Sequence, residues 1–278
     1  MKLPFLFIGH GSPMNAITDT RYSRNWRTLG AALRQQYGGH IRAVLAVSAH
    51  WCTRGSAVTA MAEPRTIHDF GGFPQALFEV QYPAPGSPEL AAQVRSLLGE
   101  DVVADDHGWG LDHGSWSVLC HLFPDAGVPV VQLSLDAGLD SAAHYALARR
   151  LAPLREQGVL MVASGSIVHN LRQTDRSAPD EPGRGYDWAE SARLRVNDWL
   201  LRADHAALTN EAAYPADLRL AAPTPDHWWP LLYAAALADA DEKPLLFNDE
   251  MVGKSLSMTS AVWGAVDWTE EGGALQAA

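Results

Sequence analysis

The sequence predicts a single α/β domain with a mostly parallel or mixed central sheet flanked by helices. Three observations favour this fold class. Short apolar runs rich in β-branched residues recur along the chain, helical patterns lie between them, and the composition stays uniform over 278 residues. Alternating strands and helices of this kind are typical of a sheet covered on both faces.

The predicted strands are apolar runs of the length of buried strands. Four of them cover 4–8, 43–48, 128–134 and 159–163. A later segment, 251–264, predicts a further strand that is a candidate for antiparallel pairing at one edge of the sheet.

Helices are expected at 87–98, 139–157 and 224–238. Ser87 is a natural N-cap before Pro88, and Gly99 is a typical stop signal. Pro153 should kink or interrupt the second helix, since a proline removes a helical hydrogen bond. Thr224 predicts the N-cap of the third helix, which would place His227 in its first turn.

Composition narrows the class of partner. A net charge of −11 argues against a nucleic-acid or anionic-membrane surface, since both call for clustered lysine and arginine. No apolar run approaches the roughly 20 residues of a membrane helix. Cys52 and Cys120 are too few for a disulfide framework. We therefore expect a cytoplasmic monomer or small homo-oligomer that binds a small molecule.

Four histidines fall where an α/β sheet usually places its ligand. His10 and His50 end two predicted strands, and His169 closely follows a third. His227 lies at the start of a predicted helix. Because ligand crevices lie beyond the carboxyl ends of the strands, these side chains are expected to converge on one crevice, where neutral imidazoles suit a metal ion.

The spacing leaves two interpretations open. The chain has neither His-Glu-x-x-His nor Cys-x-x-Cys, so a metal site would be assembled from distant segments. For any one histidine alone, a hydrogen-bonded structural role is the favoured explanation, and only their convergence makes a metal site an equal alternative. Residue types and spacing thus predict a candidate site here, but they do not decide between a metal site and structural histidines.

Longer motifs resemble the bacterial and plant DOPA-4,5-dioxygenase family, within the class III extradiol ring-cleaving dioxygenases of the LigB type. The resemblance spans nearly the whole chain and implies the α/β fold of that superfamily. It is carried by FIGHGSPMN at 7–15, VSAHW at 47–51, TIHDFGGFP at 66–74, YPAPGSP at 82–88, WGLDHGSW at 109–116, VHNLR at 168–172, PTPDH at 223–227 and SLSMTS at 255–260.

The resemblance implies that His10, His50 and His227 bind one divalent metal. It makes His169 the acid/base residue and a fourth metal ligand when substrate is absent. Elsewhere in the superfamily the third ligand is commonly glutamate, whereas this sequence has His227 with Asp226 beside it. Fe(II) is expected for activity, and Zn(II) is a candidate for the metal bound on isolation.

The implied reaction is extradiol cleavage of a catechol such as L-DOPA, with both atoms of O₂ entering a ring-opened semialdehyde. The implied catalytic domain covers 1–268, and a flexible tail is expected at 269–278. Two alternatives use the same histidines, namely a zinc-dependent hydrolase and a metal-binding protein without turnover.

Further residues are expected around the substrate. His113 is a second candidate catalytic residue, with Asp112 as the group that would orient it. His68, Asp69 and Ser257 are candidate substrate-binding residues. For His68, a turn histidine bonded to a backbone carbonyl is an equal alternative, and for Ser257 a plain strand position suffices.

Overall fold

The computed structural model describes residues 1–177 and 182–271. The predicted tail at 269–278 lies mostly outside them. Within the described part, Glu270 accepts a hydrogen bond from the Asn248 backbone N–H, and the backbone N–H of Glu271 donates to Asn25.

An eight-stranded sheet with the order β10-β13-β1-β8-β2-β7-β3-β5 forms the centre of the fold. Its strands are β1 (Phe5–Gly9), β2 (Ala43–Thr53), β3 (Ser56–Thr59), β5 (Val103–Asp106), β7 (Val130–Asp136), β8 (Val159–Gly165), β10 (Leu245–Phe247) and β13 (Ser260–Trp263). The four central strands β1, β8, β2 and β7 are parallel, and β13 is antiparallel to β1. The predicted mixed α/β fold is confirmed. The single late strand expected over 251–264 is instead three short strands, and the last of them, β13, makes the expected antiparallel pairing in the central sheet.

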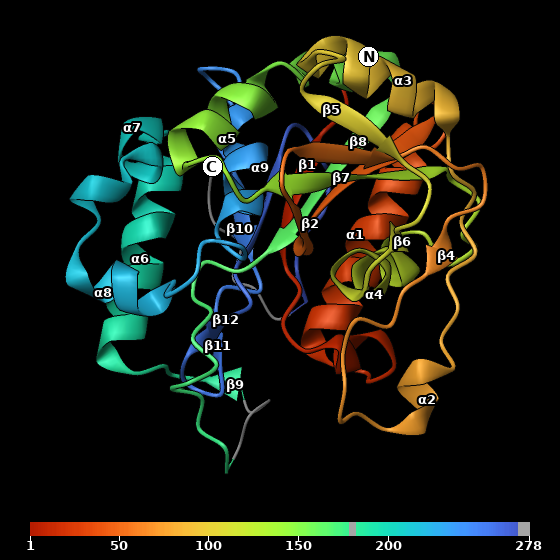
Figure 1. Ribbon diagram of the computed structural model, residues 1–278. Helices are drawn as coiled ribbons and strands as arrows, with labels where there is room; N and C mark the ends of the chain where they lie inside the picture. The colour runs from red at the N-terminus through yellow and green to blue at the C-terminus, as the bar shows by residue number, and fades with distance from the viewer. Residues whose placement is uncertain (178–181, 272–278) are drawn as a thin grey trace.

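Helices cover both faces of the sheet (Figure 1). On one face lie α1 (Arg21–Tyr37) and α4 (His113–Leu122), and on the other lie α3 (Pro88–Leu98), α5 (Ser141–Arg149), α6 (Asp187–Leu201) and α9 (Trp229–Ala236). Strand β1 illustrates the reason: Phe5 and Phe7 enter one core, while Leu6 and Ile8 enter the other. Successive side chains of a strand point to opposite faces, so an all-apolar strand needs cover on both.

Smaller elements complete the chain. They are β4 (Arg65–Thr66), β6 (Gly110–Leu111), β9 (Pro182–Gly183), β11 (Met251–Val252), β12 (Leu256–Ser257), α2 (Gln75–Phe78), α7 (His205–Thr209), α8 (Ala216–Ala221) and the 3₁₀ turns Pro13–Ala16, Ala152–Gln157 and Glu211–Ala213. None of the helices in the described part of the chain is long and apolar enough to cross a membrane.

Two predicted helices differ from the observed ones. The helix expected at 139–157 is α5, which ends at Arg149, and a 3₁₀ turn carries Pro153. The helix expected from Thr224 begins instead at Trp229, with Pro230 in its first turn. His227 therefore lies in the turn before α9, because the later of two proline signals marks the true helix start.

Candidate active site

The predicted convergence of His10, His50 and His227 is present beyond the carboxyl ends of the central strands. One ring nitrogen from each lies within 4.8 Å of those of the other two. The Nε2 atoms of His10 and His50 are 3.1 Å apart. The Nε2 atom of His227 is buried and has no hydrogen-bond partner among the described residues. Ring nitrogens this close together favour a bound cation or a shared proton, because their buried lone pairs otherwise have no partner.

A hydrogen bond fixes the tautomer of His10, which directly follows β1. The Ser164 hydroxyl at the end of β8 donates to the Gly114 carbonyl over 2.6 Å. That hydroxyl has one proton, so it must accept from His10 Nδ1, which lies 2.9 Å away. His10 Nε2 is then left with a free lone pair that faces the other two rings.

His227 is held in the same tautomer by its neighbour. Its Nδ1 donates to the Asp226 carboxylate, and its backbone carbonyl accepts from the Ser166 N–H over 2.8 Å. A Cβ on Gly165 would lie only 2.4 Å from that carbonyl, so the close approach requires glycine. A histidine ligand backed by a carboxylate is a common arrangement around metals in proteins.

His50 is presented by an irregularity near the end of β2. The pairing of β2 with β7 shifts register between Val47 and Cys52, and the His50 ring is half-buried there. Gly114 packs against this ring, since a Cβ at that position would lie 2.8 Å from His50 Cδ2. A β-bulge is a frequent means of aiming one side chain at a site.

Asp69 links His50 to His113. Its Oδ2 lies 2.9 Å from His113 Nδ1 and 3.4 Å from His50 Nδ1, and its Oδ1 accepts the His113 backbone N–H. A carboxylate beside both Nδ1 atoms favours a proton on each, which leaves both Nε2 atoms as acceptors. These three residues also form a second cluster with metal-ligand spacing, but the carboxylate already occupies its centre.

Three of these imidazoles, those of His10, His50 and His169, have a lowered pKa. Burial, reinforced by neighbouring histidines, lowers the pKa of His10 and of His50 well below the usual value. Burial also lowers the pKa of His169 to about 3. Burial opposes ionisation of Asp69, but its bond to His113 outweighs this and lowers the pKa of the carboxyl. At neutral pH, His10 and His50 therefore offer lone pairs rather than protons.

The donor set of His10, His50 and His227 fits one divalent ion. Three imidazoles converge, two are held by Ser164 and Asp226 in the tautomer that frees Nε2, and the Nε2 of His227 is buried without a hydrogen-bond partner among the described residues. Imidazole ligands suit zinc and iron, and the set offers no thiolate.

His169 lies against this centre. Its ring stacks on that of His227, with centroids 3.5 Å apart and planes 5° from parallel. Its backbone N–H donates to the Ala221 carbonyl, which fixes the turn after β8. His169 thus borders the three-histidine cluster from the side of the substrate cavity.

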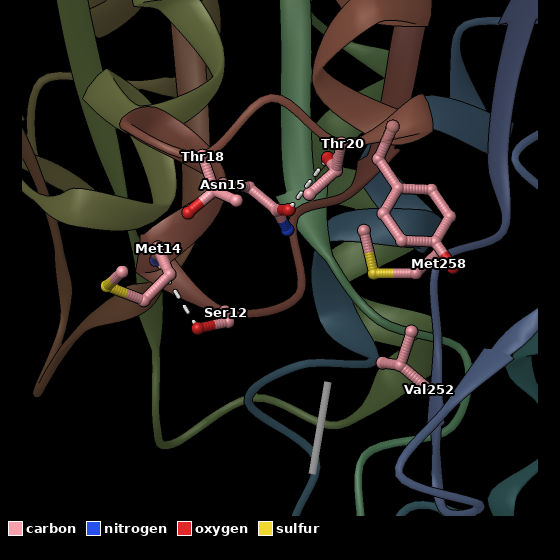
Figure 2. Close-up of a pocket in the computed structure, with 8 residues that line it drawn as sticks. Ser12, Met14, Asn15, Thr18, Thr20, Val252 and Met258 are labelled. Carbon is pink, nitrogen blue, oxygen red and sulfur yellow. Dashed lines mark hydrogen bonds between the residues drawn. The ribbon is translucent and has the colours of Figure 1, made fainter. Parts of the chain in front are cut away.

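A cavity of about 410 Å³ opens onto the cluster. All five imidazoles described above line it, and its remaining walls come from Gly11, Ser12, Pro13, Phe70, Phe73, Ser166, Leu171, Thr174 and Leu256. Ser12 also borders a smaller cavity of about 120 Å³, where Figure 2 shows it beside Met14 and across from Val252 and Met258.

Four predicted residues lie outside the wall of the large cavity, namely His68, Asp69, Asp112 and Ser257. His68 Nε2 bonds to the Val80 carbonyl over 2.9 Å, and Ser257 is buried, where its hydroxyl accepts from the Val168 N–H. Asp112 caps α4 and bonds to Gln132, so the expectation that it orients His113 is wrong. Asp69 lies beside His113 instead. The sequence favoured Asp112 for this role only because Asp112 is adjacent to His113.

Comparisons with known proteins agree with this geometry. Residues 4–263 match the family described as the catalytic LigB subunit of aromatic ring-opening dioxygenase. An Escherichia coli protein named 4,5-DOPA dioxygenase extradiol is 44% identical over 267 residues, which cover 95% of each chain. A Beta vulgaris protein of the same name is 35% identical, covering 91% of this chain and 94% of the relative.

A solved structure shares the fold. The crystal structure of an uncharacterized protein from Escherichia coli K12 has a TM-score of 0.77 and 38% sequence identity, and it covers 95% of this chain and 100% of its own. The expected family resemblance is confirmed. The chain belongs to the LigB family of aromatic ring-opening dioxygenases, and it is a metal-dependent extradiol dioxygenase that uses an aromatic substrate and O₂.

Proposed function

We propose that this enzyme opens a catechol ring beside its diol and adds both atoms of O₂ to give a semialdehyde. The observation that carries the proposal is the joint position of the three clustered imidazoles of His10, His50 and His227 and of two further imidazoles, His113 and His169, on one cavity. Extradiol chemistry needs both components, a redox metal and groups that move the diol protons.

His10, His50 and His227 would hold the metal, and Fe(II) is the ion that activity requires. A bound Fe(II) supplies the one-electron chemistry that allows O₂ to react with a catechol and the positive charge that favours the ionised diol. Zn(II) fits the same ligands and has no redox change, so we expect it to bind without supporting turnover.

His113 is suited to accept one diol proton. The Asp69 carboxylate beside Nδ1 keeps the proton on that nitrogen and leaves Nε2 as the acceptor. The side chain lines the cavity, and the Phe70 ring lies edge-on to it with centroids 5.5 Å apart. Asp69 then acts as a positioning residue rather than as a contact to substrate.

His169 is suited to exchange the second proton. Its ring is uncharged at neutral pH, borders the cavity and is held parallel to His227. A neutral imidazole here would accept a proton from the diol and return it to an oxygen atom of the substrate as the ring opens, so that no net proton is gained or lost. His169 is also a candidate fourth ligand before substrate binds.

The names of the relatives put L-DOPA first among the catechols to test. The test is oxygen consumption by protein stripped of metal and reconstituted without air with either Fe(II) or Zn(II). We expect uptake and a yellow semialdehyde with Fe(II) alone. Turnover of hydrolase substrates with Zn(II), or silence toward every catechol with both metals, would contradict the proposal.

A further inference from the structure

The walls of the large cavity beyond the imidazoles are apolar on both sides. Phe70 and Phe73 form one side, with ring centroids 5.4 Å apart and planes at 82°. Phe70 is fixed from behind by Phe78 and Trp116, whose ring centroids lie 5.0 and 6.2 Å away. This side is a rigid aromatic surface that begins at His113.

Another part of the wall carries aliphatic residues. Leu256 pairs by a single bridge with His169, and Leu171 follows that histidine by two positions. The side chain of Leu171 is 60% exposed, which is unusual for a leucine that also lines a cavity. An apolar ligand that covers this leucine removes its side chain from water, which stabilises the complex.

The hydroxyl groups on these walls are largely committed to the protein itself. Ser166 donates to the Ser257 carbonyl over 2.8 Å. The Ser255 hydroxyl donates to the Asn170 carbonyl, so the Thr174 hydroxyl, 3.1 Å from Ser255 Oγ, is the donor of that pair. Ser12 Oγ accepts the Met14 N–H and retains one proton to donate.

Among residues 1–177 and 182–271, no aspartate, glutamate, lysine or arginine lines these walls. The nearby Asp175 carboxylate is paired with Lys254 at 2.7 Å. An ammonium and a carboxylate brought into this cavity would lose water without gaining partners of opposite charge, which is costly. An apolar substituent carries no charge, so its burial has no such desolvation cost.

We propose that the preferred substrate is a catechol with an uncharged, apolar substituent rather than one with an amino-acid side chain. The diol lies at the imidazole end, and the substituent extends between the phenylalanine pair and Leu171 toward the opening. A volume of about 410 Å³ is in the range of sites for ligands larger than a bare ring. This inference rests on the catechol chemistry proposed above and adds the selectivity of the same site.

The test uses four catechols that share a short carbon chain and differ in charge. They are 4-propylcatechol, dopamine, 3-(3,4-dihydroxyphenyl)propionate and L-DOPA, which are neutral, cationic, anionic and zwitterionic. We expect kcat/KM of the Fe(II) enzyme to be at least about tenfold higher for the neutral compound than for each of the others. Calorimetry with the Zn(II) protein, in which no turnover intervenes, should show the same preference, with the lowest Kd for 4-propylcatechol.

Variants at the opening test the cause of the preference. Leu171→Asn should reduce the advantage of 4-propylcatechol several-fold, whereas Leu194→Asn, at an exposed leucine on α6, should leave the ratio unchanged. Equal or better use of L-DOPA would overturn the inference, most clearly if Arg172→Gln, at the exposed neighbour of Leu171, then removed L-DOPA activity. Absence of oxygen uptake with all four compounds and with catechol itself would instead defeat the proposed function.

Discussion

His169 and His227 lie face to face, with ring centroids 3.5 Å apart and planes 5° from parallel. The His227 ring belongs to the three-histidine cluster and both rings line the cavity, so the stack joins the proposed metal ligands to the proposed acid/base group. His227 is fixed by Asp226 and by Ser166, while the backbone of His169 is fixed by Ala221. The two rings are therefore placed by different parts of the chain and can be tested separately.

Substitution should separate the roles of these two histidines. We expect His227→Ala to lose metal as His10→Ala and His50→Ala do, because each removes one of three ligand nitrogens. His169→Ala should retain most of its metal and lose turnover by about 100-fold or more, the usual contribution of a general acid or base. Metal analysis beside oxygen uptake makes the comparison. Equal metal loss in all four variants would make His169 an obligatory ligand.

The Asp226 carboxylate should strengthen the metal site without touching the ion. In Asp226→Asn a neutral acceptor replaces the carboxylate at His227 Nδ1, so metal affinity should fall by roughly 10- to 100-fold. Competition with a chelator measures this change. Asp187→Asn, at an aspartate whose side chain is 93% exposed on α6, is the matched control and should bind metal normally. An unchanged affinity in Asp226→Asn would rule out this support.

Gly114 is required by the close approach of α4 to His50. A Cβ there would lie 2.4 Å from Ser48 Oγ and 2.8 Å from His50 Cδ2, so Gly114→Ala should displace the ligand ring. We expect a stability loss of about 1 to 3 kcal/mol, typical of overpacking, together with weaker metal binding. Gly127→Ala meets no atom within 4 Å and should be close to neutral. Denaturant unfolding of the two variants, with and without metal, measures both effects. Equal stability and equal stabilisation by metal in Gly114→Ala and Gly127→Ala would contradict this prediction.

His144 should make the protein sensitive to acid at a point remote from the active site. Burial lowers its pKa to about 4, while its ring contacts the Tyr233 hydroxyl and the Asp136 carbonyl. Because the folded pKa lies below the unfolded value, the unfolded chain binds more protons between about pH 6.5 and 4, and stability falls as pH falls through this window. The expected loss from this residue between pH 7.5 and 4.5 is roughly 2 to 3 kcal/mol.

The variant His144→Gln keeps hydrogen-bonding groups and removes the titration. Its free energy of unfolding should fall less on acidification than that of the parent, by the same roughly 2 to 3 kcal/mol. The other histidines are common to both proteins and cancel in the difference. Parallel pH dependence of the two proteins would disprove the effect.

The sequence predicts the sheet and the convergence of the three clustered histidines because both follow from local patterns. Apolar runs mark β1, β2, β7 and β8, and neighbouring parallel strands bring His10 and the end of β2 to one edge. The position of His227 was predicted for a partly wrong reason. Its helix begins at Trp229 rather than near Thr224, so the turn geometry and Asp226 hold the ring, not the first turn of a helix.

The role of Asp69 could not be derived from local patterns. Asp69 and His113 are 44 residues apart, and their contact depends on how the loop containing Phe70 folds against α4. Asp112 is adjacent to His113 in sequence, yet its carboxylate points to the helix cap and to Gln132. Adjacency along the chain says little about side-chain direction at a helix start.

Diffraction from crystals loaded with Fe(II) without air would show whether Nε2 of His10, His50 and His227 together hold one metal ion. An anomalous difference map recorded at the iron edge should contain a peak among these three nitrogens, beside the stacked ring of His169. A peak instead between His50, Asp69 and His113, the second cluster with metal-ligand spacing, would contradict the account.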